Sequence, residues 1–483
     1  MSLSNLNATT ELQVLEVFLK STTSSVIPLL LLESVIMGVL CAIVPLGSYM
    51  LWIRSVAVPR GPSISMLWLI LASLITHWAL SLRQIESTLS GRTLGLSRTF
   101  YGFIDAVSVE QGDPDFVQSY YDYASDFQYL LPLVTESVLF GFGSFLFAVT
   151  AYTSFRQVHL QSSSVFTLAI PALASLMYLL SLSHWAVSIR CFTWVASVSA
   201  RTGDSWPTSI DTLGVVLLAI LSFNAVLSDS IVLWRMSIVW ERSRPVVILA
   251  AALITTTLGL NITNLIRNSR NRDVVYNGQI YDNVHDTEVV STYGGDSVGL
   301  AAAFLSLASN LCATILVGVR VWLHKRRNSK HLHSDNRRTL VERFLVLLTD
   351  SGVVYTVLWI LYCISFFHPI TSQVVLGAKS QDKFPLVTAS GYLDAAMAQL
   401  TSIYPFAVFI LVALDKVHHS RVVRPQILRN NDWPKERTPA VTVTLEVEIE
   451  RGSTLGHTVA LPDTGSSTTA VESDTKVASA ETP

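Results

Sequence analysis

Charged residues and cysteines are both scarce in this chain. Only 14% of its 483 residues are Asp, Glu, Lys or Arg, whereas soluble globular domains carry about 25%. The formal net charge of -2 also lacks the basic excess that a nucleic-acid-binding face requires. The cysteines all lie in apolar runs, which argues against a disulfide framework and against a CxxC metal or redox site: Cys41, Cys191, Cys312 and Cys363.

Catalytic and targeting motifs are missing as well. The chain contains no Gly-x-Ser-x-Gly, no His-Glu-x-x-His, no Walker loop and no paired-carboxylate motif of intramembrane proteases. We therefore expect a protein that is not an enzyme and that has no cofactor or metal site. Residues 1–23 lack a basic start followed by an apolar core, so no cleavable signal peptide is expected. The first long apolar helix would then serve as the insertion signal.

Long apolar runs are what the chain has instead, since half of its residues are hydrophobic. A run of about 20 apolar residues is long enough to cross about 30 Å of hydrocarbon as a helix. Helices are expected because lipid cannot satisfy open backbone groups. The sequence therefore predicts an all-α polytopic transmembrane bundle of about nine spans, near residues 26–53, 65–88, 129–156, 165–194, 211–240, 245–266, 297–323, 343–367 and 387–415.

Basic residues predict the orientation, because cytoplasmic loops are enriched in Lys and Arg. With an outer N-terminus, the basic segments that follow spans 1, 3, 5, 7 and 9 all become cytoplasmic, and the acidic loops at 105–126 and 273–288 become external. Asn7 begins an Asn-Ala-Thr glycosylation sequon on the outer side. We expect an outer N-terminus, a cytoplasmic C-terminus, and the plasma membrane rather than an endomembrane.

The spans and loops divide the chain into five regions. The last of them is rich in Ser, Thr, Glu and Ala, a composition typical of disordered chain. The predicted regions are an extracellular N-terminus at 1–25, a transmembrane helix pair at 26–88, an extracellular acidic loop at 89–128, a seven-helix unit at 129–415 and a disordered cytoplasmic tail at 416–483.

The first helix pair resembles the first pair of the seven-helix unit. Residues 33–38 (ESVIMG) align with 136–141 (ESVLFG), and residues 77–83 (HWALSLR) align with 184–190 (HWAVSIR). Both pairs run from the outer side inward and back, so the repeat is parallel. An inverted repeat would have favoured a secondary transporter.

The repeat places a glutamate and an arginine at similar depths in each hairpin. A charge at the centre of a span costs about 2.5–3.5 kcal/mol on insertion scales, so such groups tend to pair. We predict Glu33–Arg83 and Glu136–Arg190 contacts, with a structural clamp favoured over a ligand or proton site. The histidines of the repeat, His77 and His184, are expected to be hydrogen-bonded packing residues rather than metal ligands.

Three further polar residues lie within predicted spans: Asp229, Asn310 and Asp350. Asp229 is costly in lipid and should face the bundle interior. It could bind a ligand, relay a proton or lock two helices together, and the lock is favoured. Near the cytoplasmic side, Arg235 and Trp240 are expected to anchor their helix at the membrane interface and to contact cytosolic partners.

A basic loop separates the seventh and eighth predicted spans. Its simplest interpretation is topology plus attraction to anionic lipid headgroups, worth about 1 kcal/mol per basic residue. A cytosolic signalling protein is the alternative partner. The candidate contact residues of this loop are Lys325, Arg326, Arg327, Arg337 and Arg338.

Short motifs recur through the seven-helix unit at 136–141 (ESVLFG), 184–185 (HW), 227–230 (LSDS), 233–235 (LWR), 239–240 (VW), 309–311 (SNL), 320–322 (RVW), 350–352 (DSG) with Tyr355, and Gln399 with 403–405 (IYP). In these motifs residues 129–415 resemble a group of multi-spanning, receptor-like membrane proteins that are common in mushroom-type fungi and unassigned in function. The resemblance covers about 60% of the chain and implies a seven-helix receptor-like unit. In this chain Asp350 replaces the usual glutamate of a Glu-Ser-Gly motif, and Ser402 replaces a usual glycine.

Three functions fit these features. The leading hypothesis is a receptor-like sensor that signals through the basic loop and the tail. The second is a transporter or channel for a small solute, with Glu136, His184 and Asp229 along its path. The third is a structural membrane assembly protein, in which side chains would fill the outer pocket.

Overall fold

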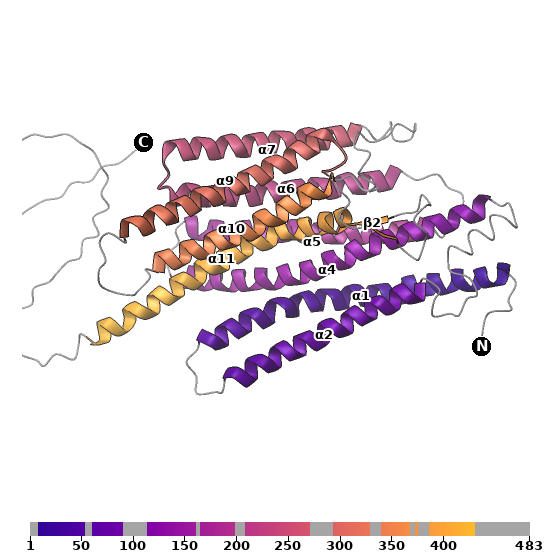
Figure 1. The fold of residues 1–483 in the computed structure, drawn as a ribbon, viewed down its shortest axis with the longest axis horizontal. Helices are drawn as coiled ribbons and strands as arrows, with labels where there is room; N and C mark the ends of the chain where they lie inside the picture. Colours follow the sequence, from indigo (N-terminus) through magenta and orange to yellow (C-terminus); the bar gives the residue numbers. More distant parts are fainter. Residues whose placement is uncertain are drawn as a thin grey trace, which may run out of the picture. The chain divides into compact units, whose positions relative to one another are not determined.

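The computed structural model describes residues 8–53, 60–89, 114–160, 165–198, 208–270, 293–328, 340–367, 372–374 and 386–429. The chain divides into two compact units, Met1–Pro425 and Gln426–Pro483. The larger unit contains the helical bundle (Figure 1). The prediction of a disordered tail from residue 416 is wrong for residues 416–429, which continue the last helix, and residues 430–483 lie outside the described residues.

The described residues form nine α-helices, and each corresponds to one predicted span. Eight of them are long and apolar enough to cross a membrane, which confirms an all-α polytopic bundle. Along α10 the described apolar stretch is shorter, Ser351–Ser365. The helices are α1 (Ala8–Ile53), α2 (Arg60–Leu89), α4 (Pro114–Leu160), α5 (Val165–Val198), α6 (Thr208–Val239), α7 (Arg244–Arg270), α9 (Ser297–Asn328), α10 (Leu340–Ser365) and α11 (Ala389–Arg429).

A short β-hairpin lies between α10 and α11 and was not predicted from the sequence. Strand β1 (Ser372–Val374) pairs antiparallel with β2 (Leu386–Thr388). Three residues per strand are too few for an alternating pattern to be recognised.

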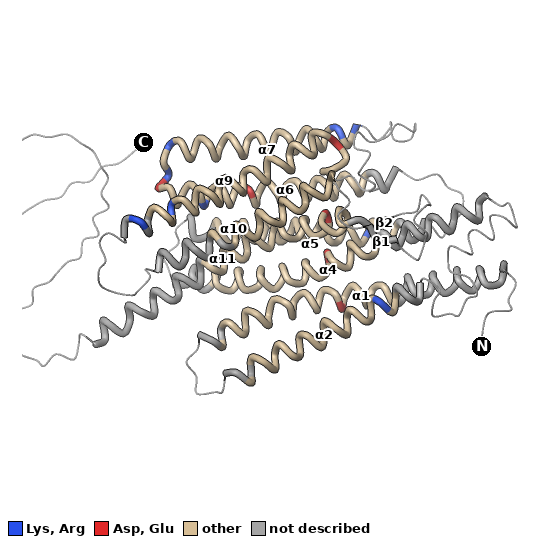
Figure 2. Tube along the Cα trace, in the orientation of Figure 1, with Lys and Arg blue, Asp and Glu red and all other residues tan. Residues whose placement is uncertain are grey.

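Charged residues are sparse along the middle of the described helices, as expected for segments that cross lipid (Figure 2). The largest hydrophobic cluster among the described side chains lies among α6, α7, α9, α10 and α11 and includes the fully buried Met236, Trp359 and Tyr362. By contrast, Leu71 is the one buried residue among the described side chains of α2.

Helices α1 and α4 run side by side in the same direction (Figure 1). Their backbones approach most closely at two glycines that are equivalent in the repeat. A Cβ atom added to Gly38 would lie 1.8 Å from the Val138 carbonyl oxygen, and one added to Gly141 would lie 2.0 Å from the Val35 carbonyl oxygen. In the repeat Gly38 is equivalent to Gly141, and Val35 is equivalent to Val138. Each glycine therefore contacts the valine of the other copy, and the two copies pack through a pseudo-twofold interface. Small residues allow such close approach between membrane helices.

Candidate functional site

The two copies of the repeat share the same hydrogen bond across their hairpins. Trp78 Nε1 donates to Ser34 Oγ at 3.1 Å in the first copy, and Trp185 Nε1 donates to Ser137 Oγ at 3.0 Å in the second. Both serines are fully buried. The repeat found in the sequence is therefore a repeat of side-chain contacts and not of letters alone.

Each copy also pairs its glutamate with its histidine. His77 Nδ1 lies 3.3 Å from Glu33 Oε1, and His184 Nδ1 lies 2.6 Å from Glu136 Oε1. The first pair is exposed on the surface of the bundle, with side-chain exposures of 74% for His77 and 38% for Glu33. The second pair is buried, at 10% for His184 and 2% for Glu136.

These pairs correct the prediction that the glutamates contact arginines. Neither Arg83 nor Arg190 forms an ion pair with them among the contacts of the described residues. Each arginine lies six residues beyond the histidine of its copy, which is about 9 Å farther along the helix. The histidine is therefore the basic group at the depth of the carboxylate. The expectation of a hydrogen-bonded packing histidine is confirmed for His184 and is wrong for His77, whose side chain is 74% exposed.

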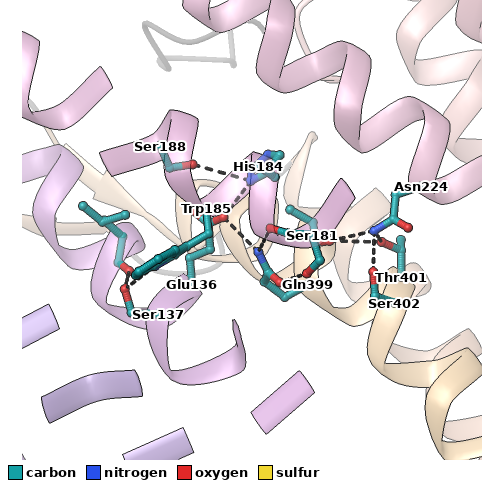
Figure 3. A network of polar contacts seen from close by, with 12 residues as sticks. Glu136, Ser137, Ser181, His184, Trp185, Ser188, Asn224, Gln399, Thr401 and Ser402 are labelled. Atoms are coloured by element: carbon teal, nitrogen blue, oxygen red, sulfur yellow. Dashed lines mark hydrogen bonds and ion pairs between the residues drawn. The ribbon is translucent and has the colours of Figure 1, made fainter. Parts of the chain in front are cut away.

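Helix α11 adds a third partner to the second copy (Figure 3). Gln399 Nε2 donates to Glu136 Oε1 at 3.0 Å, and Ser181 Oγ donates to Gln399 Oε1. We call Glu136, Ser181, His184 and Gln399 the first polar cluster. It joins α4, α5 and α11. The sequence did not identify Ser181 as a candidate, and Gln399 was noted only as part of a family motif.

A group of hydrogen bonds between α6 and α11 lies beside this cluster (Figure 3). The Asn224 side-chain amide donates to Thr401 Oγ1 at 3.0 Å, to Ser402 Oγ at 2.6 Å and to the Ala398 carbonyl at 3.2 Å. Sequence reasoning missed Asn224. Its position in the middle of an apolar span was the signal that could have identified it.

Asp229 is buried at 1% exposure and faces the bundle interior, as predicted. Asn310 Nδ2 of α9 donates to Asp229 Oδ1 at 2.9 Å. The preceding residue, Ser228, shares a 3.1 Å hydrogen bond with Tyr355 Oη of α10. We call Ser228, Asp229, Asn310 and Tyr355 the second polar cluster. Successive positions on a helix point about 100° apart, so two neighbouring residues of α6 reach two different helices.

Arg235 corrects another prediction, because it is buried at 7% exposure rather than placed at the membrane interface. Its guanidinium carbon lies 5.6 Å from the centroid of the Tyr404 ring of α11. It also lies near α10, since its Nη2 would be 3.6 Å from a Cβ atom at Gly352. A long arginine side chain can turn inward from a helix end, and this orientation removes Arg235 from the candidate cytosolic contacts in this conformation.

The connection between α6 and α7 holds the end of α6 against α9. Trp240 is partly buried and its Nε1 donates to the Leu316 carbonyl at 3.1 Å. Glu241 forms an ion pair with Arg320 of α9, whose guanidinium carbon also lies 5.7 Å from the Trp240 ring centroid. Both Glu241 and Arg242 have a φ of 54°, a conformation that usually favours glycine.

The remaining predicted site residues are described only in part. Arg326 is exposed, with its guanidinium carbon 5.3 Å from the Trp322 ring centroid. The backbone at Lys325, Arg327 and Asp350 is helical, and their side chains lie outside the described part of the chain. Asn7, Arg337 and Arg338 also lie outside it. Among the described residues, no group of three or more His, Cys, Asp or Glu side chains could hold a metal ion.

Comparisons with known proteins identified no relative of this chain. No protein-family model, curated protein or solved structure matches the chain. The resemblance of residues 129–415 to fungal receptor-like proteins therefore stays a prediction, and the functional argument depends on the site itself.

Proposed function

We propose that this chain is a receptor-like membrane sensor. In this proposal helices α4–α11 change their packing when a ligand binds. The observation that carries the proposal is the series of buried polar residues along α6. Each contacts a neighbouring helix, and ionisable or polar groups within spans are by default candidates for function. The residues are Asn224 at 1% exposure, Ser228 at 0%, Asp229 at 1% and Arg235 at 7%.

The packing around α6 favours a sensor over a solute path. The Tyr355 and Tyr404 rings of α10 and α11 stack with centroids 4.3 Å apart and planes 2° apart. Trp359 is 1% exposed and lies edge-on to Tyr355. In the second polar cluster Asn310 donates to Asp229, and Ser228 shares a hydrogen bond with Tyr355, so buried side chains occupy this part of the interior. A transporter needs a polar lining that solute can reach.

The end of α6 provides a route for a signal to leave the bundle. A displacement of α6 would act on α9 through the contacts of Trp240 with Leu316 and of Glu241 with Arg320. Helix α9 ends at Asn328 and so forms the first residues of the basic segment that the sequence predicts at 324–342. In this proposal the loop is cytoplasmic and contacts a signalling protein, with anionic lipid headgroups attracted to the same residues. The N-terminus is outside, and the membrane is the plasma membrane.

Capture of partners from native membranes by the full chain tests this proposal. Wild type and an Arg326→Gln/Arg327→Gln variant are compared, with Arg83→Gln as a control that removes a positive charge from the first helix pair. We expect wild type and Arg83→Gln to recover G-protein subunits or an arrestin-like protein, and the loop variant to recover several-fold less.

Solute flux in reconstituted vesicles provides the contrary outcome. Wild type and Asp229→Asn are loaded at equal density into vesicles and tested with small ions and metabolites. A flux that wild type supports and Asp229→Asn abolishes would identify a transporter and overturn the sensor proposal. Equal recovery of partner proteins by the loop variant would also contradict it.

A further inference from the structure

The exposed face of α1 and α2 contains a Glu–His pair among mostly apolar side chains and a few hydroxyl residues. On α1 the exposed residues Leu29, Leu32 and Ile36 recur at helical spacing, and Glu33 lies among them. On α2, His77 is flanked one turn to either side by exposed Ser73 and partly exposed Ser81. Both members of the pair lie within the candidate membrane spans Val26–Tyr49 and Ile64–Ile85.

The equivalent pair in the second copy of the repeat shows how such a pair is covered. There α11 packs over Glu136 and His184, and Gln399 donates a hydrogen bond to the carboxylate. In the first copy the Ser–Trp hydrogen bond and the Glu–His pair are both present. Among the described residues, no helix takes the place of α11 beside Glu33 and His77. The position equivalent to Ser181 is Leu74.

Lipid is a poor environment for an exposed carboxylate and imidazole. A charged side chain in the middle of a span costs about 2.5–3.5 kcal/mol on insertion scales, and such residues face protein interiors almost always. The apolar neighbours of Glu33 gain nothing by leaving lipid, because lipid tails are equally apolar. The ion pair is therefore the part of this face that favours a protein partner.

We propose that this face binds the same face of a second copy of the chain, forming a twofold dimer through Glu33 and His77. The contact within each copy uses Glu33 Oε1 and His77 Nδ1. When the imidazole is protonated, as an ion pair requires, both ring nitrogens donate. The contact then leaves Glu33 Oε2 as an acceptor and His77 Nε2 as a donor, so the face is self-complementary, as a twofold interface requires. Each His77 Nε2 donates to Glu33 of the other copy. Ser73 and Ser81 allow the two α2 helices to approach closely.

Dimer formation by the full chain in lipid bilayers tests the proposal. Single-molecule photobleaching over a range of protein densities gives the dimer fraction for wild type and for a Glu33→Leu/His77→Leu variant. Replacing both members of an ion pair by apolar residues is often neutral or stabilising for the fold, and circular dichroism and thermal unfolding check this. We expect wild type to dimerise and the double variant to have a dimer dissociation constant raised about tenfold or more.

Cysteine crosslinking locates the interface. Leu32→Cys places a thiol on the proposed face, and Ile248→Cys places one at an exposed site on α7, 68% exposed, as the matched control. The partly exposed Cys41 and Cys312 are replaced by Ala in every variant. We expect intermolecular disulfides with Leu32→Cys and not with Ile248→Cys. The proposal is overturned if wild type stays monomeric at every density, if the double variant dimerises equally, or if only the α7 thiol crosslinks.

Discussion

At the scale of single residues, the position of a side chain in the bundle decides what a given polar group does. Glu33 and Glu136 belong to the same motif and have the same histidine partner. One is exposed at the bundle surface, and the other is buried with an additional hydrogen bond from Gln399. The repeat therefore contains a matched pair of sites that differ in burial.

This difference predicts unequal effects of the same substitution. Glu136→Ala leaves His184 and Gln399 without their buried acceptor, and removing one partner of a buried pair costs about 3–5 kcal/mol. Glu33→Ala removes an exposed interhelical contact, which is worth about 0.6 kcal/mol. Unfolding of both variants in mixed micelles, at protein concentrations too low for self-association, measures the two losses. Equal losses would contradict the assignment of the first polar cluster as the buried copy.

At the scale of helices, a few residues decide how closely two helices pack and how a helix ends. Gly38 and Gly141 allow α1 and α4 to pack backbone to backbone. The end of α6 has Arg242 N–H donating to the Ser237 carbonyl at 2.8 Å and Glu241 N–H donating to the Ile238 carbonyl at 2.9 Å. This is a Schellman motif, in which glycine is the usual residue at the left-handed position. Here that position is Glu241.

The helix contact predicts that Gly38→Ala is destabilising. The added Cβ atom would lie 1.8 Å from the Val138 carbonyl oxygen, so α1 and α4 must separate, at a cost of about 1–3 kcal/mol. Gly47→Ala is the control within the same helix, because nothing lies within 4 Å of its added Cβ atom. It should be neutral or stabilising by up to about 1 kcal/mol. Thermal unfolding in micelles compares the two, and a smaller loss for Gly38→Ala would argue against the α1–α4 interface.

The α6–α7 connection predicts that Arg242→Gly is stabilising. Arg242 is exposed and has a φ of 54°, and a non-glycine residue in this region costs on the order of 1 kcal/mol. Glycine should recover about that amount, seen as a higher unfolding temperature. Arg242→Ala removes the same charge and keeps the Cβ atom, so it should give no gain. If both variants were equally stabilised, charge and not backbone conformation would be the cause.

At the scale of the whole molecule, the chain consists of a helix pair packed against a seven-helix unit through a repeat of that unit's own first pair. The pseudo-twofold relation of the two pairs follows from the reciprocal Gly38–Val138 and Gly141–Val35 contacts. Helix α11 covers one pair only. This asymmetry is the reason that the two copies of one motif have different surroundings.

Orientation is the prediction that belongs to this scale. With an outer N-terminus, Asn7 should carry a glycan, and Asn7→Gln should remove the mobility shift caused by glycosidase treatment. An epitope placed after residue 470 should be reached by antibody only in permeabilised cells. An accessible tail in intact cells would reverse the topology that the basic residues predict.

The sequence by itself determined the helical bundle, its spans and the repeat, because a hydrophobic run of membrane length is a local property that needs no knowledge of neighbours. It also indicated that Asp229 faces inward. Only the tertiary structure decided which groups meet: histidine instead of arginine beside both glutamates, Gln399 over one copy alone, and Arg235 turned into the interior. Helices that are apolar on all sides carry little information about which side faces which neighbour, since lipid and protein interiors are similarly apolar. Those contacts depend on the rotation and lateral order of the helices, and these are set by packing across the whole bundle.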